Sequence, residues 1–81
     1  MRFVYRPDVI EALLAHGVRP TEHTRPELAR DFVRDLYKYE IRKLRERYLR
    51  SEFPKLEYAE RVVELRNRYP VLALIARHWV M

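Results

Sequence analysis

The fold is decided by residues 37–69, which read "YKYEIRKLRERYLRSEFPKLEYAERVVELRNRY". Large apolar residues recur in the first half at spacings of 4, 3 and 4, and the second half repeats this spacing. Such a pattern places one apolar seam along each of two helices. The segment "SEFP" between them holds the only proline of the stretch, so we expect the chain to turn there and form an antiparallel helical hairpin. The two seams are Tyr37, Ile41, Leu44 and Tyr48, and Tyr58, Val62, Leu65 and Tyr69.

Helix-end signals bound the hairpin on both sides. Thr24 and Glu27 have the spacing of a capping box, which predicts that the first helix begins there. Ser51 is a suitable N-cap for the second helix. That helix should end at about Tyr69, because the residue before a proline is pushed out of helical geometry, and Pro70 follows.

A shorter helix precedes the hairpin. Pro7 and Asp8 are typical of a first helical turn, since proline needs no hydrogen-bonded N–H there and an acid favours the positive helix end. Gly17, the only glycine, stands where a left-handed residue would stop the helix. Residues 1–6 are expected to be ordered coil.

The C-terminal stretch "PVLALIARHWVM" (70–81) is apolar nearly all round, which predicts a short buried helix or a docked extended segment. We therefore expect one all-α domain spanning residues 1–81. In it, a short N-terminal helix packs on a long antiparallel helical hairpin that the apolar C-terminal segment closes.

The positive charge is concentrated in one place. The net charge is +5, and residues 38–50, with six basic and two acidic side chains, carry +4 of it. A basic helix face with nearby tyrosines suits phosphate contacts and base stacking. Cations are also favoured near any helix C-terminus, and the sequence favours this solvated-face interpretation. The candidate nucleic-acid-binding residues are Arg34, Lys38, Arg42, Lys43, Arg45, Arg47 and Arg50.

Few residues suit catalysis or metal binding. There is no cysteine and no glycine-rich loop, and the histidines at 16, 23 and 78 stand apart. Glu27, Asp31 and Asp35 share a helix face, but no Glu-x-x-His element accompanies them. We predict no catalytic residue, no metal, no cofactor and no small-molecule substrate, and therefore no enzyme.

The C-terminal segment suggests a protein partner. A small domain with surplus apolar surface at one end tends to pair, although the same residues would also serve as core. The candidate partner-binding residues are Val71, Leu72, Leu74, Ile75 and Trp79.

Two functions follow from these patterns. The first expectation is a non-enzymatic protein–protein interaction or assembly module that self-associates through the C-terminal segment and the tyrosine seam. The alternative is an RNA- or DNA-binding accessory protein that uses the basic helix face. No secretory signal is visible and the longest apolar run, 70–76, is too short to span a bilayer. We thus expect a cytoplasmic protein without a membrane partner.

Overall fold

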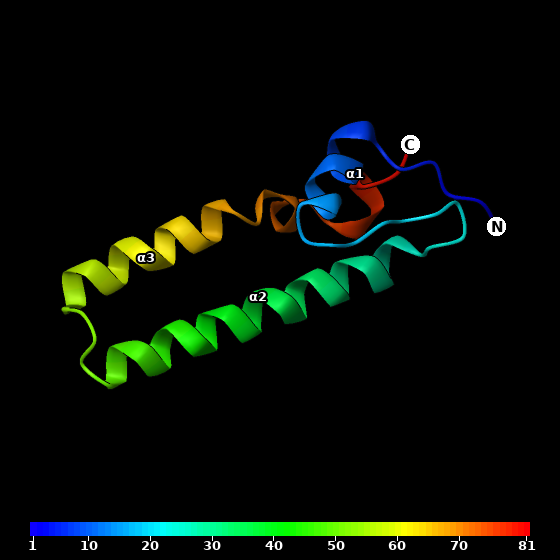
Figure 1. Ribbon diagram of the computed structural model, residues 1–81. Coiled ribbons are helices and arrows are strands. Elements are labelled where there is room, and N and C mark those ends of the chain that lie inside the picture. The colour runs from blue at the N-terminus through cyan, green and yellow to red at the C-terminus, as the bar shows by residue number, and fades with distance from the viewer.

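The computed structural model describes residues 1–81 as a rod with extents of 49 × 18 × 16 Å. The chain forms three α-helices and two 3₁₀ turns but no strand, which confirms the predicted all-α class. Figure 1 shows α2 running along the whole rod, with α3 beside one half of it and the remaining elements beside the other half. The elements are α1 (Pro7–Leu14), α2 (Pro26–Leu49), α3 (Lys55–Asn67), η1 (Pro70–Ala73) and η2 (Ala76–His78).

The helices α2 and α3 form the hairpin that the two seams predicted (Figure 1). The rings of Tyr48 and Tyr58 stack across it, with centroids 4.5 Å apart and planes 10° from parallel. Phe53 is buried beneath the turn. The guanidinium groups of Arg47 and Arg61 lie over its ring, 5.3 and 4.5 Å from the centroid. An aromatic cluster therefore holds the closed end of the hairpin.

Both α1 and α2 end in the same backbone motif. Gly17 and Ser51 have positive φ angles of 76° and 62°. In each case the N–H of the next residue bonds to the carbonyl five positions earlier, at 2.9 Å after α1 and 3.2 Å after α2. These bonds satisfy carbonyl groups that would otherwise be orphaned at the helix end. The expected role of Ser51 as an N-cap is wrong, because this residue terminates α2.

The helix starts also differ from expectation. Arg25 and Pro54 occupy the N-cap positions of α2 and α3, and neither makes a side-chain cap bond. Pro26 takes the first helical position, so Thr24 lies one residue too early to cap the helix. The Thr24 hydroxyl instead accepts the N–H of Thr21 at 2.9 Å. The predicted capping box is therefore absent.

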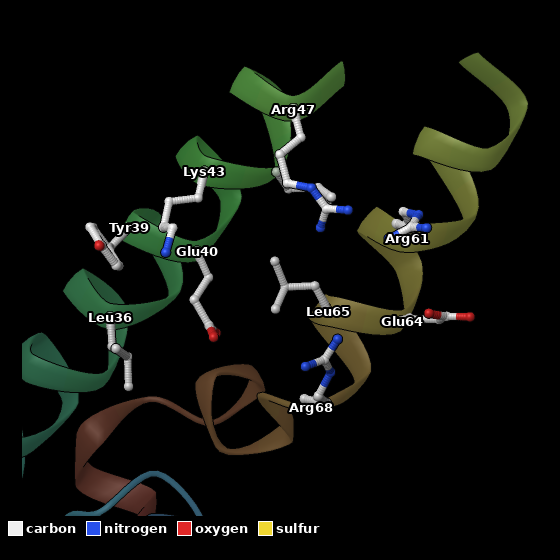
Figure 2. A pocket seen from close by; sticks show the side chains of 10 residues that line it. Leu36, Tyr39, Glu40, Lys43, Arg47, Arg61, Glu64, Leu65 and Arg68 are labelled. Atoms are coloured by element: carbon white, nitrogen blue, oxygen red, sulfur yellow. The ribbon is translucent and has the colours of Figure 1, made fainter. Parts of the chain in front are cut away.

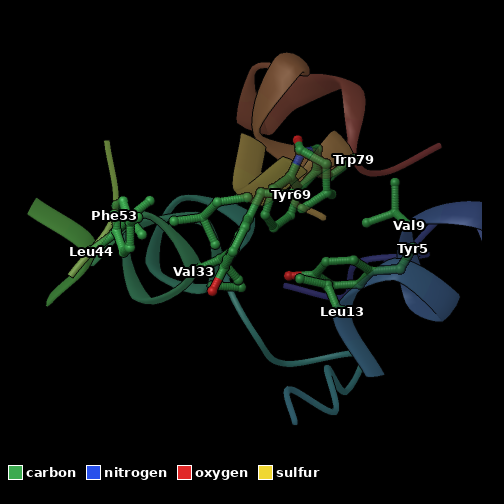
Figure 3. Packing of buried hydrophobic residues seen from close by; sticks show 11 residues of the cluster. Tyr5, Val9, Leu13, Val33, Leu44, Phe53, Tyr69 and Trp79 are labelled. Carbon is green, nitrogen blue, oxygen red and sulfur yellow. The ribbon is translucent and has the colours of Figure 1, made fainter. Parts of the chain in front are cut away.

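Residues 1–20 and 70–81 pack together at one end of the rod, which we call the head. Trp79, Leu13 and Val33 are fully buried and bring the C-terminal segment, α1 and α2 into one core (Figure 3). The two chain ends pair locally, since the Arg6 N–H donates to the Trp79 carbonyl at 2.9 Å and the Met81 N–H donates to a carbonyl of the N-terminal arm at 2.8 Å.

Arg30 ties the head to α2. Its guanidinium donates to the carbonyl of Leu74 at 2.9 Å and to that of Leu72 at 2.8 Å. The C-terminal segment thus docks in two 3₁₀ turns against one long helix and α1. None of the helices combines the length and the apolar character needed to cross a membrane.

Candidate nucleic-acid interface

Three of the seven predicted basic residues have acidic partners. The Arg34 guanidinium lies 3.2 Å from the Asp31 carboxylate. Arg47 and Arg50 both pair with Glu52, at 3.0 and 3.3 Å. The hydrogen bond from Arg47, aided by the nearby positive charges, lowers the pKa of Glu52. The charge of these three arginines is therefore largely compensated within the chain.

The other predicted residues form no ion pair. Lys43 lies apart from the rest, with its ammonium 5.3 Å from the centroid of the Tyr39 ring. Lys38, Arg42 and Arg45 line a common groove between α2 and α3. The structure thus divides the predicted basic set and gathers three uncompensated cations in one place.

A fourth cation comes from α3. Arg66 lines the same groove, which has a volume of about 450 Å³, and it too has no acidic partner. The floor is formed by Tyr37, Ile41 and Val62, all of them half-buried. We call this feature the cationic groove: Lys38, Arg42, Arg45 and Arg66 above a floor of Tyr37, Ile41 and Val62.

No carboxylate lines the cationic groove. In α3 the residues Glu57, Glu60 and Glu64 recur at spacings of 3 and 4 and so share one face. At 100° per residue that face lies opposite Arg66. In α2, Glu46 follows Arg42 by one helical turn but forms no ion pair with it. The lining of the cationic groove therefore carries four positive charges and no negative one.

The opposite side of the hairpin has a second groove of about 390 Å³, in which charges of both signs mix. Figure 2 shows Glu40 and Leu65 pointing between the helices, whereas Glu64 points away from them. Arg61 pairs with Glu57 on α3 at 3.1 Å. The lining residues are Leu36, Tyr39, Glu40, Lys43, Leu44, Arg47, Arg61, Glu64, Leu65 and Arg68. Because acids accompany its cations, this groove resembles an ordinary solvated surface.

The predicted apolar partner surface is only partly available. Val71 and Trp79 are 3% and 0% exposed, and the Trp79 indole N–H donates to the Val71 carbonyl at 3.2 Å. These two residues belong to the core and must be removed from the predicted surface. Leu72 and Leu74 are half-buried, and only Ile75 is well exposed. The physical reason is that Val71 and Trp79 pack with Val9, Leu13 and Val33 in the core that joins α1 to α2.

The tyrosine seam is also used within the chain. Tyr48 and Tyr58 stack on each other, and Tyr69 is buried against Tyr37 and His16, at centroid distances of 5.1 and 4.1 Å. The seam side chains therefore pack against one another within the chain, and self-association through them stays a prediction. Tyr37 alone keeps part of its surface in the cationic groove.

The sequence could have pointed to Arg66. It follows Leu65 of the apolar seam and lies one helical turn after Val62, at the position where a flanking side chain reaches the neighbouring helix. A count of the charges along α2 alone does not include Arg66, because the groove is lined by residues of both α2 and α3.

Comparison of the chain with protein-family models, with curated proteins and with solved structures returns no match. No group of three or more histidine or carboxylate side chains is placed to hold a metal ion.

Proposed function

We propose that the protein binds nucleic acid through the cationic groove. The observation that supports this proposal is the gathering of four unpaired cations from two helices without a carboxylate. Like charges held close together repel one another, and a phosphate backbone that binds among them relieves this repulsion and releases counterions. The sequence alone favoured protein–protein interaction over nucleic-acid binding. We now prefer nucleic-acid binding, because Val71 and Trp79 of the expected apolar surface are buried in the core.

The rigidity of the site supports the same function. The cations stand on two packed helices rather than on loops. Arginine suits the task because its planar guanidinium can donate two parallel hydrogen bonds to a phosphate. Three of the four cations are arginines, and an apolar floor suits the aliphatic stems of such side chains.

Fluorescence anisotropy with labelled RNA and DNA oligonucleotides over a salt series tests the proposal. We expect dissociation constants of about 10–100 µM at physiological salt, as for non-specific binders. Four phosphate contacts to a single strand would give a slope of log K against log salt of roughly −3, at about −0.7 per contact. No binding tighter than about 1 mM would contradict the proposal.

A matched pair of variants separates the groove from general charge. The triple substitution Lys38→Gln, Arg42→Gln and Arg45→Gln should reduce affinity at least tenfold and flatten the salt dependence. The control replaces Arg34, Arg47 and Arg50 with glutamine, which removes the same charge from the same helix outside the groove. An equal loss in both variants would show that the groove has no special role.

A second candidate is self-association through the outer face of α2. Leu28, Phe32 and Tyr39 are 61%, 58% and 56% exposed and recur at helical spacing. Figure 1 shows that α3 and the head both lie on one side of this helix, so its other side has no neighbour within the chain. The acids at 31 and 35 precede the cations of α2, so two antiparallel copies would match opposite charges.

Sedimentation velocity decides whether this second candidate holds. A weak dimer should appear at about 100 µM protein, a concentration suited to a micromolar dissociation constant, and Phe32→Ser should abolish it. Leu49→Ser, at an equally exposed site near the hairpin turn, is the control. A wild-type chain that stays monomeric excludes the candidate without affecting the nucleic-acid proposal.

A further inference from the structure

Beside the cationic groove, where the hairpin meets the head, lies a mainly apolar pocket of about 460 Å³ that shares two lining residues with the groove. Its volume lies within the roughly 300–1,000 Å³ of sites that hold small ligands. The lining residues are Tyr37, Arg66, Asn67, Tyr69, Pro70, Leu72 and Ala73. We call this feature the apolar pocket.

Two residues belong to both features. Tyr37 lies in the floor of the cationic groove and in the wall of the apolar pocket, and Arg66 lines both. The Tyr37 ring is half-buried and meets the Tyr69 ring edge-on, at 5.1 Å between centroids and 65° between planes. A ligand that extends along the groove would therefore pass from a cationic surface directly onto an aromatic one.

We propose that the groove and the pocket together select single-stranded nucleic acid by accepting one unpaired base. The phosphates lie along the four cations, and the base enters the apolar pocket against Tyr37 and Leu72. Asn67 at the pocket edge offers an amide donor and an acceptor to the base edge. This inference rests on the proposed function and adds to it the class of nucleic acid.

The chemistry of the two parts favours a nucleotide. Phosphates match the groove in charge, and every base has an aromatic face suited to an aromatic and aliphatic wall. The bases of a duplex are paired and stacked, so one of them could reach the pocket only by leaving the stack, which is costly. A duplex would thus contact the cations through its backbone and leave the pocket unused.

The decisive comparison uses two single strands with the same phosphates. One is an oligonucleotide of about ten nucleotides, a length typical of single-strand sites, and the other is its abasic counterpart with an identical sugar–phosphate chain. Anisotropy titrations at fixed salt should give the base-containing strand at least about tenfold higher affinity, since base stacking contributes on this scale. A duplex of the same sequence should show a salt dependence from the cations but gain nothing from the pocket.

Variants in the pocket should remove the discrimination without removing the charge contacts. Asn67 and Ala73 are exposed, so Asn67→Ala and Ala73→Leu should leave the fold intact, which circular dichroism verifies. Both should bring the affinities of the two strands closer together while the salt slope stays unchanged. Arg42→Gln should do the reverse, reducing the slope and keeping the ratio of the two affinities.

The outcomes separate this inference from the proposed function. Equal affinity of the wild-type chain for the base-containing and the abasic strand would overturn the base-binding inference while the groove still binds phosphates. A ratio that persists in both Asn67→Ala and Ala73→Leu would place base recognition outside the pocket and also overturn it. Absence of binding to every probe would overturn the proposed function itself, and with it this inference.

Discussion

The Tyr69 hydroxyl donates a hydrogen bond to the Glu40 carboxylate and so joins the end of α3 to the middle of α2. Tyr69 is 4% exposed, and its ring stacks on that of His16 at the end of α1. The side chain that follows α3 therefore contacts both α2 and the end of α1 where the hairpin enters the head. Glu40 lines the groove on the side of the hairpin opposite the cationic groove, so the bond crosses the hairpin there.

Replacing Tyr69 with phenylalanine should lower the free energy of unfolding by about 1–2 kcal/mol. The ring contacts remain, so the loss reflects one hydrogen bond to a charged acceptor that is partly open to water. Urea denaturation of the two proteins measures the difference. The control is Tyr39→Phe, because Tyr39 is exposed and lines the same groove as Glu40. It should change stability by less than about 0.5 kcal/mol.

The same bond predicts a dependence of stability on pH. Burial, and then the hydrogen bond to Glu40 and its negative charge, raise the pKa of Tyr69 above the ordinary value of 10.0. The folded chain therefore holds this proton more tightly than the unfolded chain. The stabilisation is complete below the unfolded-state pKa and is lost as the pH rises above it.

Thermal melts between about pH 8 and 11 should show wild-type stability falling at the alkaline end. Tyr69→Phe should fall less steeply over the same interval. Some decline should remain in that variant, because burial also raises the pKa of Tyr5. Parallel curves for the two proteins would mean that Tyr69 does not contribute to the alkaline loss.

Substitutions at the two positions with positive φ should change the stability of the chain in opposite directions. Gly17→Ala should destabilise the chain by about 1 kcal/mol, since a side chain disfavours the left-handed conformation. The cost comes from the backbone alone, because no atom lies within 4 Å of the added Cβ. Ser51→Gly should stabilise by about 0.5 kcal/mol, because the relief of strain exceeds the added flexibility of glycine. Chemical denaturation midpoints test both, and two changes of the same sign would contradict this account.

Truncation of side chains in the apolar seam should destabilise the hairpin in proportion to their burial. Leu44 is 9% exposed between α2 and α3, so Leu44→Ala should cost about 2–4 kcal/mol. Leu28→Ala removes the same atoms from an exposed site on the same helix and should change stability by no more than about 0.5 kcal/mol. Val62 is only half-buried, so Val62→Ala should cost about 1 kcal/mol, less than its place in the seam alone would suggest.

Much of the helical framework could be predicted from the sequence because periodicity and breakers are local signals. The two apolar seams predicted the hairpin of α2 and α3, and Gly17 predicted where α1 ends. The caps were misjudged where two signals compete. Pro26 occupies the first helical position, so the N-cap is Arg25, one residue after the expected Thr24. Ser51 adopts a left-handed conformation that usually favours glycine.

The site was harder to predict because burial and pairing depend on tertiary contacts. Arg34 and Lys38 look equivalent on a helical wheel, yet only Arg34 has acidic partners. Arg66 joined the groove only once α3 had folded back against α2. The chemistry of Trp79 suits an interface and a core equally well. In the fold it is a core residue, because its side chain fills the space between α1 and α2.

Arg30 provides the last prediction, and it concerns how the C-terminal segment is held. Its guanidinium donates to two carbonyls of that segment, a geometry that a planar group with several donors suits well. Arg30→Gln should lower stability by about 1–2 kcal/mol, because both part-buried carbonyls lose a charged donor. Arg34→Gln is the matched control, since it removes the same charge from an exposed ion pair one turn later and should cost less than about 0.5 kcal/mol. Hydrogen exchange should be faster in Arg30→Gln at the indole N–H of Trp79 and at the amides of 71–79. Unchanged exchange there would mean that the core contacts of Trp79 hold the segment without Arg30.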